Sequence, residues 1–163
     1  AQASVQAAGI LCPKVPSGNY RVLIKAGKDS SVQILSVLPN PAAGLSEAAL
    51  QKMYQQNMRL FVLEEQLATI VDTIDAKLSV WGKQTTNDEI SKKIKSLDSF
   101  KRELIELNRK SIFFDEQKFR RKISDFYLDM VRALEPLSES QEKGINVLEA
   151  EMKVYQDRLK SLL

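Results

Sequence analysis

The chain has 163 residues, of which 44% are hydrophobic and 28% charged, and its net charge is +3. This composition is typical of a globular domain rather than a disordered chain, and so small a net charge does not by itself indicate a polyanionic partner. No apolar run approaches the roughly 20 residues of a membrane-spanning helix, so we expect no transmembrane segment.

The residue types that most often carry catalysis and metal binding are scarce. The chain has no histidine, and Cys12 is its single cysteine. Histidine is the commonest general base and a frequent metal ligand, while one cysteine allows neither an internal disulfide nor a thiolate cluster. We read Cys12 as a small apolar residue, and we expect a protein that is not an enzyme and binds no cofactor or metal.

The N-terminal segment is small, polar and free of charge over residues 1–8. It starts at Ala1-Gln2-Ala3 without methionine, as a chain does after removal of a targeting peptide or when produced from a shortened gene. We expect a flexible arm and an exported protein. Pro13, Pro16 and Gly18 then mark a change of local structure.

Two stretches rich in β-branched residues follow, at 20–26 and 32–38, with turn residues at 27–31 between them. This pattern predicts a β-hairpin. Apolar side chains fall on both of its faces, and a two-stranded hairpin is marginally stable alone in water. The ribbon therefore needs a cover, either its own helices or another chain by strand addition. The hairpin residues we expect to contact a partner are Tyr20, Val22, Ile24, Val32 and Ile34.

A long helix is predicted over 46–81, because no proline or glycine occurs before Gly82 and apolar residues recur at every seventh position. These positions are Met53, Leu60, Leu67, Ile74 and Trp81. Asn57 and Glu64 occupy companion positions of the same seam. They could fix the register of helix packing, lie in solvent, or face a partner. Trp81 is expected to plug the core beneath a turn or to serve as a contact residue.

Two further amphipathic segments complete a bundle. Thr86 and Glu89 form a candidate capping box before an apolar stripe over 90–114, which continues one step out of phase over 119–134. This arm is either one helix with a stutter or two helices, with Asp115 as a candidate cap. Ser138 and Gln141 form a second candidate capping box before a stripe over 145–162.

A basic cluster lies on the second arm, at Arg109, Lys110, Arg120, Arg121 and Lys122. Acidic residues are interleaved with it, which favours a solvated face laced with ion pairs. Contact with nucleic acid or an anionic membrane surface is the alternative.

The sequence thus predicts a mainly α protein: an elongated antiparallel three- or four-helix bundle over 45–163 with a small N-terminal β-hairpin and arm over 1–44. We expect a structural or accessory subunit of a larger, extracytoplasmic assembly that contacts protein partners or further copies of itself. The alternatives are a polyanion-binding module and a helical chaperone or adaptor whose exposed seam at Asn57 and Glu64 holds a client helix.

Overall fold

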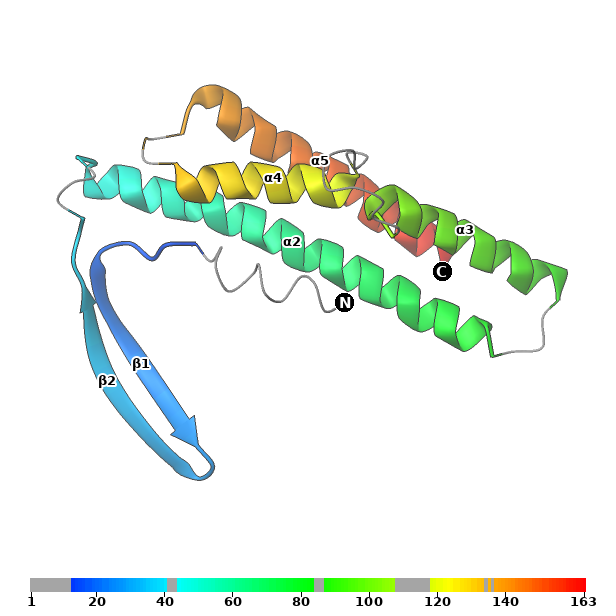
Figure 1. Cartoon of the computed structure of the whole chain (residues 1–163), viewed down its shortest axis with the longest axis horizontal. Coiled ribbons are helices and arrows are strands. Elements are labelled where there is room, and N and C mark those ends of the chain that lie inside the picture. Colours follow the sequence, from blue (N-terminus) through cyan, green and yellow to red (C-terminus); the bar gives the residue numbers. More distant parts are fainter. Residues whose placement is uncertain (1–12, 41–43, 84–86, 108–117, 134, 136) are drawn as a thin grey trace.

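The computed structural model describes residues 13–40, 44–83, 87–107, 118–133, 135 and 137–163 (Figure 1). Within these residues the chain forms a two-stranded hairpin and then four helices. They are, in order, β1 (Gly18–Ala26), β2 (Asp29–Val37), α2 (Glu47–Trp81), α3 (Asp88–Leu104), α4 (Phe119–Arg132) and α5 (Glu139–Leu162). The expected arm over 1–8 and Cys12 lie outside the described residues.

The helices form an elongated bundle along α2, as predicted (Figure 1). At 1.5 Å per residue α2 is about 52 Å long. α3 and α4 run one after the other in the opposite direction, and the ion pair between Lys101 and Asp75 marks this antiparallel course. α5 runs parallel to α2, since Lys52 pairs with Glu142 and Arg59 with Glu149.

The long helix has the predicted bounds. The Ser46 side chain accepts a hydrogen bond from the Ala49 backbone N–H at 3.2 Å, which caps the first turn. Four of the five heptad positions are buried and Trp81 is half-buried, but the buried stripe is wider than the heptad pattern, because α2 packs against both α3–α4 and α5. The buried residues are Met53, Asn57, Leu60, Leu63, Leu67, Ile70 and Ile74.

The described residues of the second arm form two helices. Its first helix is capped by Asn87, whose side-chain oxygen accepts from the Ile90 N–H at 2.8 Å, rather than by the expected Thr86, which lies outside the described residues. α3 ends at Leu104 and α4 begins at Phe119. Asp115, the candidate cap for α4, also lies outside the described residues.

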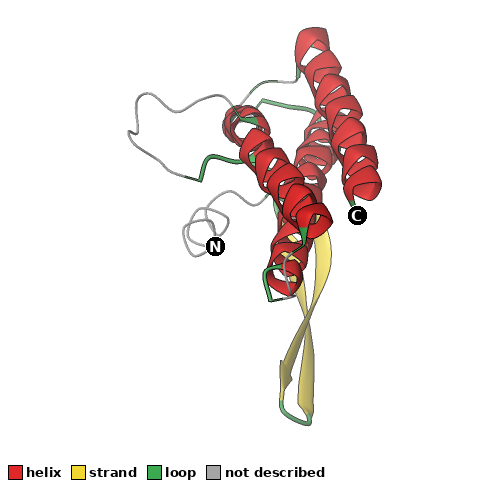
Figure 2. Cartoon of the chain, turned by 90° about the vertical axis from the view of Figure 1, so that its right-hand side faces the viewer, coloured by secondary structure: helices red, strands yellow, loops and turns green. Residues whose placement is uncertain are grey.

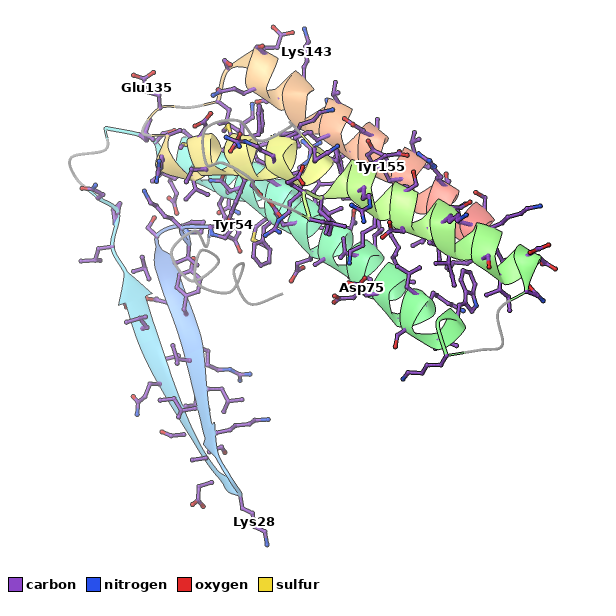
Figure 3. All side chains as sticks on the ribbon, turned by 45° about the vertical axis from the view of Figure 1, so that its right-hand side comes forward. Lys28, Tyr54, Asp75, Glu135, Lys143 and Tyr155 are labelled. Carbon is purple, nitrogen blue, oxygen red and sulfur yellow. The ribbon has the colours of Figure 1, made fainter. Side chains whose placement is uncertain are left out.

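Aromatic side chains from three helices meet where the second arm is divided. The centroid of the Tyr155 ring on α5 lies 4.8 Å from the centroid of the Phe119 ring on α4 and 6.1 Å from that of the Phe100 ring on α3. Both phenylalanines are fully buried, and Tyr155 points into the bundle between the helices (Figure 3). α5 thus joins the end of α3 to the start of α4 through apolar contacts.

The last helix starts at the predicted capping box, in which the Ser138 and Gln141 side chains each bond to the other residue's backbone N–H. Its core-facing residues are buried as the stripe predicts, at Ile145, Leu148, Met152 and Leu159. No helix within the described ranges is long and apolar enough to cross a membrane.

The hairpin extends away from the bundle (Figures 1 and 2). β1 and β2 pair antiparallel from Gly18 opposite Val37 to Ala26 opposite Asp29, so the turn is only Gly27–Lys28. β1 starts two residues and β2 three residues earlier than predicted, and β2 ends at Val37 rather than at 38. Gly27 has φ +61° and Lys28 has a negative φ, a combination found in the two-residue turns that start with glycine. Extensive packing along its own helices, one of the two covers considered for the ribbon, is not observed among the described residues.

Candidate protein-interaction site

The two faces of the hairpin follow from its strand register. Tyr20 lies opposite Leu35 and Val22 opposite Gln33, so these residues share one face with Ile24. Leu23 lies opposite Val32, and these two share the other face with Ile34, which lies opposite Arg21. The predicted contact residues therefore divide between the faces: Tyr20, Val22 and Ile24 on the first, Val32 and Ile34 on the second.

Most of the hairpin's apolar side chains are open to solvent on both faces. The exposed fraction is 38% for Val22 and 59% for Ile24 on the first face, and 50% for Val32 and 66% for Ile34 on the second. Leu23 and Leu35 are exposed to a similar degree. Contiguous apolar exposure of this kind is uncommon on a protein surface and is typical of interaction sites.

Two side-chain hydrogen bonds lie at the base of the hairpin. The Tyr20 hydroxyl donates a hydrogen bond to the Pro16 carbonyl at 2.7 Å, and Tyr20 is half-buried. Ser36 donates to Asn19, the residue directly opposite, at 2.6 Å. Both contacts lie within the hairpin segment, while Lys28 at the tip lies far from the helices (Figure 3).

Both long edges of the ribbon are unpaired. The sheet has two strands only among the described residues, so the outer backbone N–H and C=O groups of β1 and of β2 have no strand beside them. Such edges are templates for pairing with another strand. The site thus offers two kinds of contact, apolar faces and hydrogen-bonding edges.

The sequence-based list of contact residues omitted Leu23 and Leu35. Leu35 belongs to the Tyr20 face, and its place depends on the strand register, which the two-residue turn sets. The broader turn expected at 27–31 left that register undefined. The Gly27-Lys28 pair was the signal that could have defined it.

Trp81 does not join this site. It is the last residue of α2, at the end of the bundle far from the hairpin (Figure 1). Its side chain is half-buried against the bundle core, which agrees with its interpretation as a core plug.

The basic cluster is only partly described. Arg109 and Lys110 lie outside the described residues. On α4, the Arg121 guanidinium lies 3.2 Å from the Asp125 carboxylate, the Lys122 ammonium lies 3.0 Å from that of Glu151, and Arg120 is exposed. Two of these three cations therefore already have carboxylate partners.

The polar positions of the α2 seam are covered rather than open. Asn57 is buried, and Glu64 is half-buried and accepts a hydrogen bond from the Ser124 hydroxyl of α4 at 2.5 Å. Burial raises the pKa of Glu64, while the Ser124 hydrogen bond and the positive charge of Arg120 act in the opposite direction. The exposed seam expected for a client helix is therefore absent at Asn57.

A shallow groove of about 590 Å³ runs between α2 and α5. Arg59 crosses it: its guanidinium bonds both carboxylate oxygens of Glu149, at 2.8 and 2.6 Å, and the side-chain oxygens of Gln56 and Asn146. This bond pattern raises the pKa of Arg59 and lowers that of Glu149. Since each polar group already has a partner within the chain, we interpret the cluster as a clamp between the two helices.

The described residues contain no group of three or more histidine, cysteine or acidic side chains placed to hold a metal ion. Comparisons of the chain with protein-family models, with curated proteins and with solved structures found no match. Inferences about function therefore depend on the geometry of the hairpin and the bundle.

Proposed function

We propose that this protein is a non-enzymatic structural or accessory subunit of a larger protein assembly, and that it joins the assembly through its hairpin. The observation that supports this is the exposure of apolar side chains on both faces of a ribbon whose edges are also unpaired. A two-stranded hairpin gains most of its stability from a third strand or an apolar cover. A protein partner supplies both.

In this proposal the bundle is a rigid support for the ribbon. Its core runs through α2, α3, α4 and α5, and the Arg59–Glu149 clamp holds α5 against α2. None of the helices packs extensively on the hairpin. The ribbon is therefore free to bind while the bundle keeps its own contacts.

The test follows the chain in extracts of cells that produce it, with sedimentation as the readout. Val22→Lys combined with Ile34→Lys places one charge on each face of the ribbon. We expect the wild type to sediment within a complex larger than one chain and this variant to sediment as the free chain, because a buried unpaired ammonium opposes docking.

The matched control is Val147→Lys combined with Val154→Lys. These α5 valines are about as exposed as Ile34 and more exposed than Val22, at 63% and 64%. The control is expected to stay in the complex. A hairpin variant that sediments with the complex as the wild type does would contradict the proposal.

A further inference from the structure

We propose that the ribbon binds a second copy of this chain, by antiparallel pairing of β2 with β2 about a two-fold axis. This inference rests on the proposed function and names the partner for the same site. It requires that the β2 edge be open, that two β2 strands bring no like charges into contact, and that the residues where the two copies meet be apolar.

The outer edge of β2 is open. β1 lies on the side of the hairpin toward the length of α2, and β2 lies on the side away from it (Figures 1 and 3). Among the described residues no strand pairs with this edge. A second hairpin can therefore approach along β2 without meeting the helices of the first copy.

The charges of the two strands distinguish the edges. β1 carries Arg21 and Lys25 on one face. If two copies paired through β1 about its central residue, Val22, Arg21 of one copy would lie opposite Leu23 and diagonally beside Arg21 and Lys25 of the other. Long side chains interact across such diagonals, so these like charges oppose pairing. Natural proteins place such charges on strand edges to prevent pairing.

β2 has no such protection. Asp29 beside the turn is its one charged residue, and no charged residue or proline occurs over 30–38. In an antiparallel pair of β2 strands centred on Gln33, the two Asp29 residues would lie roughly 25 Å apart, at 3.3 Å per residue. Their repulsion is therefore small at physiological ionic strength.

The same register joins the exposed apolar residues. It places Val32 of each copy opposite Ile34 of the other, and Leu23 lies beside Val32 within each hairpin. The four-stranded sheet would thus carry one continuous aliphatic patch across its centre. Cross-strand pairs of β-branched residues of this kind stabilise sheets. The two hairpin tips would point in opposite directions, which places the two bundles at opposite ends of the sheet.

The experiment measures the mass of the purified full chain by sedimentation equilibrium from roughly 1 µM to roughly 1 mM, a range suited to a small interface. We expect the mass to rise from the 18.4 kDa of one chain toward twice that value. A variant with Val32→Lys and Ile34→Lys, and another with Val32→Glu and Ile34→Glu, are each expected to remain monomeric.

An equimolar mixture of these two variants should regain the dimer, because lysine on one copy then faces glutamate on the other. Unfolded variants would not regain it. Leu23→Lys, on the same face but on β1, should still self-associate. A wild type that stays monomeric to about 1 mM, a mixture that stays monomeric, or loss of association in Leu23→Lys would each overturn β2 pairing.

The two proposals fail separately. If the purified chain is monomeric while Val22→Lys with Ile34→Lys still removes it from the cellular complex, the ribbon binds a different protein and only the second copy is refuted. If the purified chain dimerises as described but the hairpin variant keeps its place in the complex, the proposed function is refuted instead.

Discussion

Asn57 lies in the core of the bundle, at a seam position where an apolar residue would pack. It is 7% exposed, and its side-chain oxygen has no hydrogen-bond partner among the described residues. A buried polar group without a partner costs about 1–3 kcal/mol. Of the three interpretations that the sequence allowed for Asn57, burial rules out exposure to solvent and agrees with a role in setting register.

Asn57→Leu should raise the free energy of unfolding by about 1–3 kcal/mol, because the substitution removes an unsatisfied oxygen from the core. The measurement is urea denaturation followed by circular dichroism. Gln51→Leu, at an exposed position of the same helix, is the control and should change stability by less than about 0.5 kcal/mol. A loss of stability in Asn57→Leu would show that the amide makes a favourable contact in the core.

Glu64 gives the fold a predictable pH dependence. Burial raises the pKa of this carboxyl above its unfolded value. The folded state then holds a proton that the unfolded state has already released, so the stability of the wild type falls as the pH rises from the unfolded pKa through the folded one. Above that window the whole penalty for burying the charge is present.

Glu64→Gln should therefore stabilise the protein relative to the wild type at pH 7 more than at pH 4, while keeping an acceptor for Ser124. Urea denaturation at the two pH values measures the difference. Glu65→Gln, at the exposed neighbouring position, should show no comparable change. An equal effect of Glu64→Gln at both pH values would show that the carboxylate is not penalised by burial.

At the scale of elements, the packing of α4 on α5 depends on Gly144. A Cβ atom at this position would lie 2.9 Å from the Cζ atom of the Phe126 ring. Glycine costs a helix about 1 kcal/mol relative to alanine, so Gly144 needs a structural reason within α5. The reason is that the Phe126 ring occupies the place of the missing side chain.

Gly144→Ala should consequently fail to give the usual gain of about 1 kcal/mol in the free energy of unfolding, because the ring must move. In a Phe126→Leu background the same substitution should recover that gain. A double-mutant cycle by urea denaturation measures the coupling between the two sites. Equal effects of Gly144→Ala in the two backgrounds would contradict the close contact.

Helix starts were predictable where the capping residue directly precedes the helix in the sequence, as at Ser46 and Ser138. The division of the second arm into two helices was not predictable from the sequence. Its apolar stripe shifts phase near 115, and both a stutter and a break satisfy such a shift. The break is supported by a tertiary contact, Tyr155 between Phe100 and Phe119, which involves residues far apart in the sequence.

At the scale of the whole molecule, the structure is a rigid bundle with a ribbon at one end. The sequence predicted both parts, because heptad spacing and β-branched alternation are local signals. It did not predict the course of the ribbon. Apolar residues on both faces show that a cover is needed, but they do not show whether the cover belongs to the same chain.

The candidate site was predicted in its residue types and only partly in its arrangement. Val22 and Ile24, like Val32 and Ile34, are exposed on the ribbon. Their division between two faces required the strand register. The contrast between β1, which carries Arg21 and Lys25, and β2, whose one charged residue is Asp29, required the bounds of the strands. The exclusion of Trp81 from that site required its position at the far end of α2, which only the fold defines.

Amide hydrogen exchange, measured on the full chain in its native complex and as the purified, diluted chain, tests the central claim most directly. We expect exchange to slow in the complex across Gly18–Ala26 and Asp29–Val37, because docking pairs and covers the ribbon. The outer face of α5 around Val147 and Val154 should exchange alike in both samples. Hairpin amides that exchange equally fast in both, with new protection confined to the helices, would show that the chain is held through its bundle.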